Sequence, residues 1–438
     1  MKVKTTEGDV NQSKFRADFQ KNNLSSEVLQ DLACDDKYFI NQALSTPCLN
    51  TAQGVDGIYI IDGNGRKIID WHGNSVHQLG YNHPKLVKAM QNQLKTLSFS
   101  PRRYANDTAT ACAKKLCELM PNEDFKVLFT TSGAVSNETA LKLVRKATGK
   151  HKVLSAHDSF HGATLYTISV GGTSHFRDGL EPLVDGCVHF PHYASYNSVD
   201  PDGKIALEFI ENECKKGDVG AIIIEPVRCT DVQIPPKSYF VSLREICDTY
   251  DVALIFDEIP TAFGRTGTMY SFENFGVTPD ILTLGKGLGG SLIPFSAVVA
   301  HKKFDVCGDT SMGHFTHEKN PLGSAVALAL IKEIEDSELL NRACELGEYI
   351  KSRVLNINTN LVADIRQIGA LVGVELMKNG EKAEVEAEFI LYNCLENGLS
   401  FKISQGNVLT LSPALISTDE QMKNAMNILE NAFNTLGL

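Results

Sequence analysis

The chain has 438 residues, and its 42 basic and 53 acidic residues give a formal net charge of −11. This charge disfavours nucleic acid and anionic membrane surfaces as partners. No apolar run approaches the roughly 18 residues of a membrane-spanning helix, and the length predicts two or three domains or one large α/β domain with appendages.

The cysteines and the first residues favour a reducing compartment. Eleven cysteines are scattered from Cys34 to Cys394, and no pair has zinc-finger or CxxC spacing. Free thiols fit this pattern better than disulfides. The polar beginning, MKVKTTEGDVNQ, lacks the apolar segment of a secretory signal. We expect a cytoplasmic protein without a metal site, because His189 and His192 have no carboxylate at ligand spacing.

The first 75 residues are expected to form an N-terminal arm and a hairpin segment. Residues 1–50 are polar and predict an irregular or helical arm. In residues 57–71 (GIYIIDGNGRKIIDW), apolar residues flank an Asp-Gly-Asn-Gly turn, which is a hairpin pattern. Pro84 then opens an amphipathic helix, PKLVKAMQNQL, with proline in the first turn.

A large α/β domain is expected over residues 76–330, where apolar strands alternate with helices. The predicted strands are residues 126–129, 152–155, 220–224, 253–256, 281–284 and 296–299. They are apolar throughout, which is typical of a mostly parallel sheet covered by helices on both faces. A helix is predicted after Pro321, and residues 331–438 predict a smaller α+β domain that the N-terminal segment completes.

Two ionisable residues come just after two of these predicted strands. Asp257 comes directly after strand 253–256, and Lys286 comes two residues after strand 281–284. Open α/β sheets bind ligands at the carboxyl ends of their strands, which lie roughly 5 Å apart. If the two strands are neighbours, both side chains emerge at one edge and could bridge a ligand ring. The alternative is a buried aspartate that caps a helix and a lysine on a solvated turn.

Two further segments fit the same edge. Residues 131–138 (TSGAVSNE) place small residues between a strand and a helix, where free N–H groups can bind phosphate. Residues 159–162 (SFHG) place Phe160 at a strand end, where an aromatic ring can stack on a flat cofactor. Phe160 could equally be part of the core.

Together these features resemble the class III (ω-) aminotransferases of the fold-type I pyridoxal-phosphate enzymes. The resemblance covers residues 40–435 and also includes IEP at 224–226, IFDEIPTAFGRTG at 255–267, TPDILTLGKGLGG at 278–290 and Asn320-Pro321. It implies pyridoxal 5'-phosphate (PLP) as cofactor and a homodimer with shared active sites. It also implies roles for individual residues: Lys286 as the Schiff-base lysine, Asp257 as the partner of the pyridine nitrogen, Ser132, Gly133 and Ala134 around the phosphate, Phe160 and His161 at the ring, and Thr316 at the phosphate of the neighbouring subunit.

The chain departs from that family where a keto-acid substrate is usually held. Thr230 replaces an acid that pairs with an arginine in several members, and Thr410 replaces the arginine that clamps the substrate carboxylate. Threonine cannot supply the charge of a bidentate arginine. Pro260 also replaces a glutamine that commonly contacts the ring hydroxyl, and Val135 stands where glutamate is common.

The missing clamp favours the lyase branch of the family, which removes a group β to the amine and releases ammonia and an aldehyde. The predicted substrate is a small amino alcohol that carries a phosphonate. Its anion would be held by Arg228, Arg103 or Arg102, with Trp71 also near the pocket. The alternatives are an ω-aminotransferase that uses pyruvate or another keto acid, a phospho-lyase acting on an amino-alcohol phosphate, and a scaffold that binds without reacting.

Overall fold

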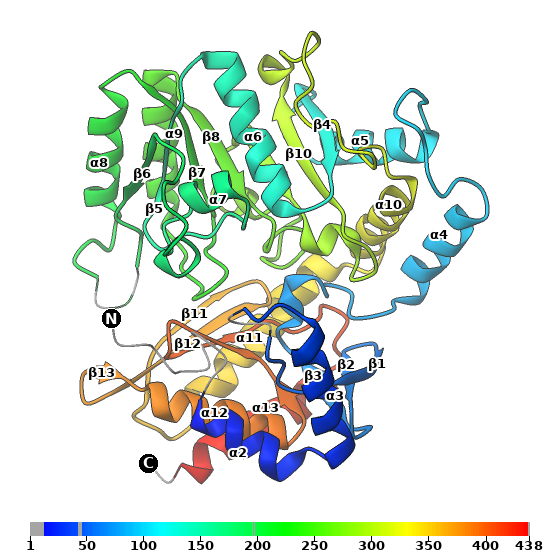
Figure 1. Ribbon diagram of the computed structural model, residues 1–438. Coiled ribbons are helices and arrows are strands. Elements are labelled where there is room, and N and C mark those ends of the chain that lie inside the picture. The colour runs from blue at the N-terminus through cyan, green and yellow to red at the C-terminus, as the bar shows by residue number, and fades with distance from the viewer. Residues whose placement is uncertain (1–12, 43–45, 195, 197, 437–438) are drawn as a thin grey trace. The chain divides into compact units, whose positions relative to one another are not determined.

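The computed structural model describes residues 13–42, 46–194, 196 and 198–436 (Figure 1). The chain divides into two compact units. The terminal unit comprises Met1–His83, Thr230–Val232 and Asn341–Leu438, and the central unit comprises Pro84–Cys229 and Gln233–Leu340. In the described part of the chain, no helix has both the length and the apolar character needed to span a membrane.

The central unit is built on a seven-stranded sheet with the order β4-β10-β9-β8-β7-β5-β6. Its strands are β4 (Phe125–Thr130), β5 (Lys152–Ala156), β6 (Cys187–Phe190), β7 (Val219–Ile224), β8 (Ala253–Asp257), β9 (Ile281–Leu284) and β10 (Ser296–His301). The pairs from β6 to β9 are all parallel, and β10 runs antiparallel to β9 and β4. The mostly parallel sheet is therefore confirmed, and β6 is a strand that was not predicted.

Both faces of this sheet are covered by helices, as the uniformly apolar strands indicated (Figure 1). Ile255 of β8 belongs to the core on the face covered by α6. The next residue, Phe256, makes an edge-to-face contact with Phe240 of α9, with ring centroids 5.5 Å apart. The helices of this unit are α4 (Pro84–Leu94), α5 (Asp107–Glu118), α6 (Gly133–Thr148), α7 (Leu165–Val170), α8 (Lys204–Cys214), α9 (Lys237–Tyr250) and α10 (Pro321–Asp336).

The terminal unit is α+β. One sheet has the order β1-β2-β3-β14, and another has the order β11-β12-β16-β15, with β13 paired to β12. The strands are β1 (Ala52–Asp56), β2 (Tyr59–Asp62), β3 (Lys67–Asp70), β11 (Val362–Ile368), β12 (Leu371–Lys378), β13 (Glu381–Lys382), β14 (Leu399–Ser400), β15 (Lys402–Ser404) and β16 (Val408–Leu411). The helices are α2 (Lys14–Asn23), α3 (Ser26–Tyr38), α11 (Leu339–Leu355, which begins in the central unit), α12 (Glu384–Glu396) and α13 (Asp419–Thr435).

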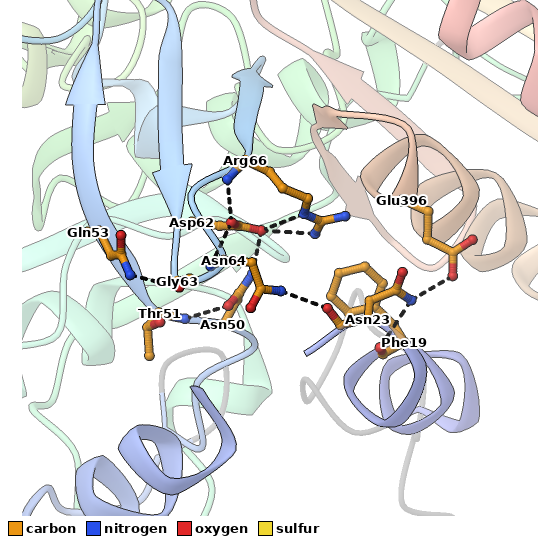
Figure 2. Close-up of polar contacts among 10 residues, drawn as sticks. All are labelled: Phe19, Asn23, Asn50, Thr51, Gln53, Asp62, Gly63, Asn64, Arg66 and Glu396. Carbon is orange, nitrogen blue, oxygen red and sulfur yellow. Dashed lines mark hydrogen bonds and ion pairs between the residues drawn. The ribbon is translucent and has the colours of Figure 1, made fainter. Parts of the chain in front are cut away.

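The predicted hairpin is present as β2 and β3, and its turn is held by a polar cluster (Figure 2). The carboxylate of Asp62 accepts hydrogen bonds from the backbone N–H groups of Asn64 at 3.0 Å and Arg66 at 2.9 Å. The Asn64 amide donates to the carbonyl of Asn23 at 2.8 Å, and the Asn23 amide donates to Glu396 at 3.0 Å. The turn is thereby tied to α2 and α12.

Five short 3-10 helices complete the described secondary structure. They are η1 (Gly73–Ser75), η2 (Ser174–Phe176), η3 (Ser271–Asn274), η4 (Lys286–Gly289) and η5 (Lys302–Phe304). Of these, η4 begins at Lys286, two residues after β9 ends.

Candidate active site

Asp257 and Lys286 leave the same edge of the central sheet. Strands β8 and β9 are parallel neighbours, and Asp257 lies opposite Thr283 in their register. The backbone N–H of Glu258 continues this pairing by donating to the Thr283 carbonyl at 3.1 Å. Because Lys286 follows Thr283 by only three residues, both ionisable side chains belong to one strand-end cluster.

The carboxylate of Asp257 is buried and surrounded by hydrogen-bond donors. Its Oδ2 accepts a bond from Nδ2 of Asn137 at 2.7 Å and lies 2.9 Å from Nδ1 of His161. Its Oδ1 accepts the backbone N–H of Ile259 at 3.1 Å. The amide and the backbone N–H can only donate, so the ionised carboxylate matches these partners. An anionic acceptor is what a protonated pyridine nitrogen requires.

The following acid, Glu258, is directed elsewhere. It is buried and accepts the backbone N–H groups of Ser271 at 2.6 Å and Phe272 at 2.7 Å. Burial raises the pKa of Glu258 to about 8. Glu258 therefore caps η3 and is not part of the strand-end cluster.

Lys286 starts η4 in the left-handed region, with φ of +43°. This conformation is strained for a residue with a Cβ, and such strain is concentrated at functional sites. The Lys286 side chain is exposed, while the residues on both sides of it are buried. The turn therefore directs one accessible amine out of an otherwise packed segment.

The start of α6 provides a site for an anionic group. Ser132 caps the helix by accepting the backbone N–H of Val135 at 3.3 Å, and Gly133 and Ala134 form the first turn. First-turn N–H groups have no acceptor within a helix and favour phosphate. A Cβ on Gly133 would lie 2.5 Å from Ile259, and one on Gly162 would lie 2.4 Å from Ala134. Glycine thus lets the helix start approach the loops after β8 and β5 closely.

Two of the predicted cofactor contacts are exposed in this chain. Phe160 is 40% exposed, and its ring centroid lies 4.6 Å from that of Phe176 at an interplanar angle of 45°. Thr316 is exposed in the turn that precedes Asn320, the N-cap of α10. Stacking by Phe160 and a contact of Thr316 with a neighbouring subunit remain predictions.

Glu225 also belongs to the cluster, although the sequence did not single it out as a site residue. It follows β7, which lies next to β8 in the sheet. Burial raises the pKa of Glu225 to about 7, and the negative charge of Asp257 is the second cause. The positive charges of Arg228 and Lys286 act in the opposite direction. Glu225 therefore shares an electrostatic environment with both predicted catalytic residues.

The three candidate arginines differ in their surroundings. Arg228 donates from Nη2 to the Asp158 carbonyl at 3.0 Å. It also lines a pocket together with Glu225 and Gln233. Arg102 and Arg103 are both exposed on the loop before α5, and neither forms an ion pair or hydrogen bond within the described part of the chain. The structure brings Arg228, but not Arg102 or Arg103, into the environment of Glu225.

Trp71 belongs to the terminal unit. It is 1% exposed, and its backbone N–H donates to the Ser400 carbonyl at 2.8 Å. Among the described residues, the Trp71 indole N–H has no hydrogen-bond acceptor. A role for Trp71 in substrate binding remains a prediction.

Thr230 and Thr410, where the resemblance implies an acid and an arginine that pair with one another, lie in direct contact. Thr410 on β16 donates its hydroxyl hydrogen to the Thr230 carbonyl at 2.6 Å. Arg366 fixes the next two residues by donating to the carbonyls of Asp231 at 2.9 Å and Val232 at 3.0 Å. Side-chain hydrogen bonds from Thr410 and Arg366 to backbone carbonyls therefore hold this segment.

The residues of the central unit fit PLP. Asp257 would supply the anionic acceptor for the ring nitrogen, Lys286 the amine for the aldehyde, and the start of α6 the donors for the phosphate. Two polar residues that were not predicted as site residues, Asn137 and Thr283, are bonded to one another at 2.7 Å, and Asn137 also binds Asp257. A usable signal was present, since Thr283 is the only polar residue in the strand Ile281–Leu284.

Comparison with known proteins agrees with this fit. The aminotransferase class-III family matches residues 41–433. The chain is 41% identical to (R)-1-hydroxy-2-aminoethylphosphonate ammonia-lyase of Vibrio splendidus, over 98% of this chain and 94% of that protein. It is 32% identical to acetylornithine aminotransferase of Methanothermobacter thermautotrophicus, over 94% of this chain and 100% of that protein. The solved structure of an omega transaminase from Pseudomonas jessenii in complex with PMP superimposes with a TM-score of 0.86 at 25% identity, covering 94% of this chain and 98% of that one. The chain belongs to the class-III aminotransferase family and is a PLP-dependent enzyme of the α/β fold of that family.

Proposed function

We propose that this enzyme is an ammonia-lyase that converts (R)-1-hydroxy-2-aminoethylphosphonate to phosphonoacetaldehyde and ammonia by β-elimination. The observation that carries this assignment is the hydrogen bond between Thr410 and Thr230, at the two positions where the resemblance implies a charged keto-acid clamp. A transaminase must bind a second, anionic keto acid, and neutral threonines offer no bidentate cation for its carboxylate. The identity of 41% to a protein named for this activity supports the same substrate.

Bound PLP supplies an electron sink for the carbon next to the substrate amine. The exposed amine of Lys286 takes the proton from the aminomethyl carbon and returns a proton to the departing β-hydroxyl, which leaves as water. Asp257 stays anionic and holds the ring nitrogen in its protonated form. The released enamine is then hydrolysed to ammonia and the aldehyde. This hydrolysis consumes one water, which equals the water lost in the elimination.

Arg228 is proposed to hold the phosphonate. Its guanidinium lies with Glu225 around one pocket at the strand ends, whereas Arg102 and Arg103 are exposed on a separate loop. Arginine matches the oxygen atoms of a phosphonate by paired, charge-assisted hydrogen bonds. We also propose a homodimer in which Thr316 of each subunit contacts the phosphate in the site of the other.

The test is an assay of ammonia release by the PLP-loaded enzyme without any keto acid. The hydroxylated aminoethylphosphonate is compared with 2-aminoethylphosphonate, which lacks the leaving group, and with an amino-alcohol phosphate. We expect ammonia and aldehyde in equal amounts from the first compound alone. Release from the amino-alcohol phosphate would instead indicate a phospho-lyase. Consumption of amine only after addition of pyruvate or 2-oxoglutarate would identify the enzyme as an ω-aminotransferase and overturn the proposal.

A further inference from the structure

Asn137 occupies a buried position where α6 meets the ends of β8 and β9. Its side chain is fully buried, although it is the fifth residue of a 16-residue helix. Burial of an amide is unfavourable unless its donors and acceptor are all bonded. The partners of Asn137 therefore show what this position is for.

Each polar atom of the Asn137 amide has a defined partner. Oδ1 accepts the hydroxyl hydrogen of Thr283 at 2.7 Å. Nδ2 donates to Oδ2 of Asp257 at 2.7 Å and to the His161 carbonyl at 2.8 Å. A flipped amide would place its oxygen against the oxygens of Asp257 and His161, so these two acceptors select the orientation in which the NH₂ group faces Asp257. The Thr283 hydroxyl holds the amide oxygen on the other side.

These contacts determine how Asp257 is presented. Its Oδ2 is occupied by Asn137 and His161, and its Oδ1 is held by the backbone N–H of Ile259. Both carboxylate oxygens are thus held by hydrogen-bonding groups that match the ionised carboxylate. We infer that Asn137 is a positioning residue that, held by Thr283, keeps Asp257 in one rotamer and in the ionised state in which it binds the ring nitrogen of PLP. This inference rests on the cofactor of the proposed function but not on its lyase reaction.

Three variants separate this role from simple packing. Asn137→Asp keeps the shape and the acceptor for Thr283, but it turns an oxygen toward Asp257 in place of the NH₂ group. Thr283→Val keeps the shape of Thr283 and removes only the hydroxyl that holds the Asn137 amide oxygen. Thr283→Ser keeps that hydroxyl and serves as the matched control.

The readouts are the dissociation constant of PLP, measured by titrating each cofactor-free protein, and the pH at which the bound cofactor is lost on acidification. Asn137→Asp should weaken PLP binding by at least about tenfold, because a hydrogen bond to a charged group is replaced by repulsion. It should also release PLP at a higher pH than the wild type, because two facing carboxylates take up a proton more readily. Thr283→Val should weaken binding by about fivefold, and Thr283→Ser should bind like the wild type.

Melting of the cofactor-free proteins reports on folding. Weak PLP binding by Thr283→Val, together with recovery in Thr283→Ser, supports the inference even if Asn137→Asp folds poorly. Equal PLP affinity in Thr283→Val and Thr283→Ser, or wild-type affinity and acid release in Asn137→Asp, would overturn it. Failure of the lyase assignment would instead appear in the wild-type enzyme as an absence of ammonia release without keto acid, while the affinities in this series would be unaffected.

Discussion

The hydroxyl of Thr410 donates a 2.6 Å hydrogen bond to the carbonyl oxygen of Thr230, 180 positions earlier in the chain. The resemblance to the family places the arginine clamp at one of these positions and its acidic partner at the other. The structure shows that the two positions are in contact, because the Thr410 side chain donates to the backbone of residue 230. The same Thr410 hydroxyl lies 3.2 Å from the hydroxyl of Ser404, and the buried Thr410 lies opposite Lys402 of β15 in the strand register. This hydrogen bond stands where the resemblance implies a charged pair.

Restoring the charged pair should change which reaction the enzyme performs. The double variant Thr230→Glu with Thr410→Arg supplies both the acid and the arginine of the charged pair. A keto-acid carboxylate thereby gains a cationic partner. We expect amine consumption that depends on pyruvate or 2-oxoglutarate to rise by at least about tenfold over the wild type, as one bidentate pair contributes on the order of 1.5–3 kcal/mol. Formation of alanine or glutamate measures it. Thr410→Val, which removes only the hydrogen bond, is the control, and an equal gain in that variant would contradict the assignment of the clamp.

Replacement of Arg228 should weaken binding of the phosphonate without changing the chemistry. Arg228→Gln should raise KM for the phosphonate substrate by about 10- to 100-fold at nearly constant kcat, because the interaction is present equally before and during the reaction. Arg228→Lys should restore part of the affinity, since lysine supplies the charge but not the paired geometry. Steady-state kinetics of Arg228→Gln and Arg103→Gln decide between the sites. A large rise in KM in Arg103→Gln alone would assign the phosphonate to the exposed loop.

Glu225 should make the cofactor-free protein less stable as the pH rises. Its pKa is raised from 4.5 to about 7 in the folded chain, so between these values the folded protein keeps a proton that the unfolded chain releases. The free energy of unfolding therefore falls as pH rises through this window, and Glu225→Gln removes that loss. We expect the variant to gain up to about 3 kcal/mol over the wild type between pH 5 and pH 8. Urea unfolding at both pH values measures this gain, and an equal difference at the two pH values would be inconsistent with a raised pKa of Glu225.

The thiols should divide sharply by reactivity. Cys34 and Cys344 are exposed, whereas Cys112 and Cys247 are buried. Burial raises the pKa of Cys112 to about 12 and the pKa of Cys247 further, which suppresses their thiolate forms. A thiol reagent at neutral pH should modify Cys34 and Cys344 first and the buried thiols only after unfolding. All eleven cysteines should react in denaturant without reductant, and a smaller number would indicate a disulfide.

Much of the central sheet was predictable because its strands are buried on both faces. Runs such as residues 220–224 and 281–284 are apolar throughout and correspond to β7 and β9. The short strand Cys187–Phe190 was missed because it has only four residues and includes His189, so it lacks a continuous apolar run. The turn of residues 62–65 was predictable from its glycines, since both hairpin strands flank it directly.

The sequence predicted where the site lies on the sheet better than it predicted which residues form it. Placing Asp257 and Lys286 at one edge required only that β8 and β9 be neighbours, a condition that the structure meets. The contact between Asn137 and Asp257 joins residues 120 positions apart and depends on the packing of α6 against the sheet. The exposure of Arg102 and Arg103 likewise depends on the fold, because nothing in a pair of arginines indicates which surface it faces.

The number of ammonia molecules released per subunit in the absence of keto acid tests the lyase assignment most directly. The PLP-loaded enzyme is mixed with excess (R)-1-hydroxy-2-aminoethylphosphonate, and ammonia and aldehyde are followed over time. We predict sustained release of many equivalents of both per subunit, with no requirement for pyruvate or 2-oxoglutarate. Capture of at most one amino group per subunit, followed by arrest until a keto acid is added, would contradict the account.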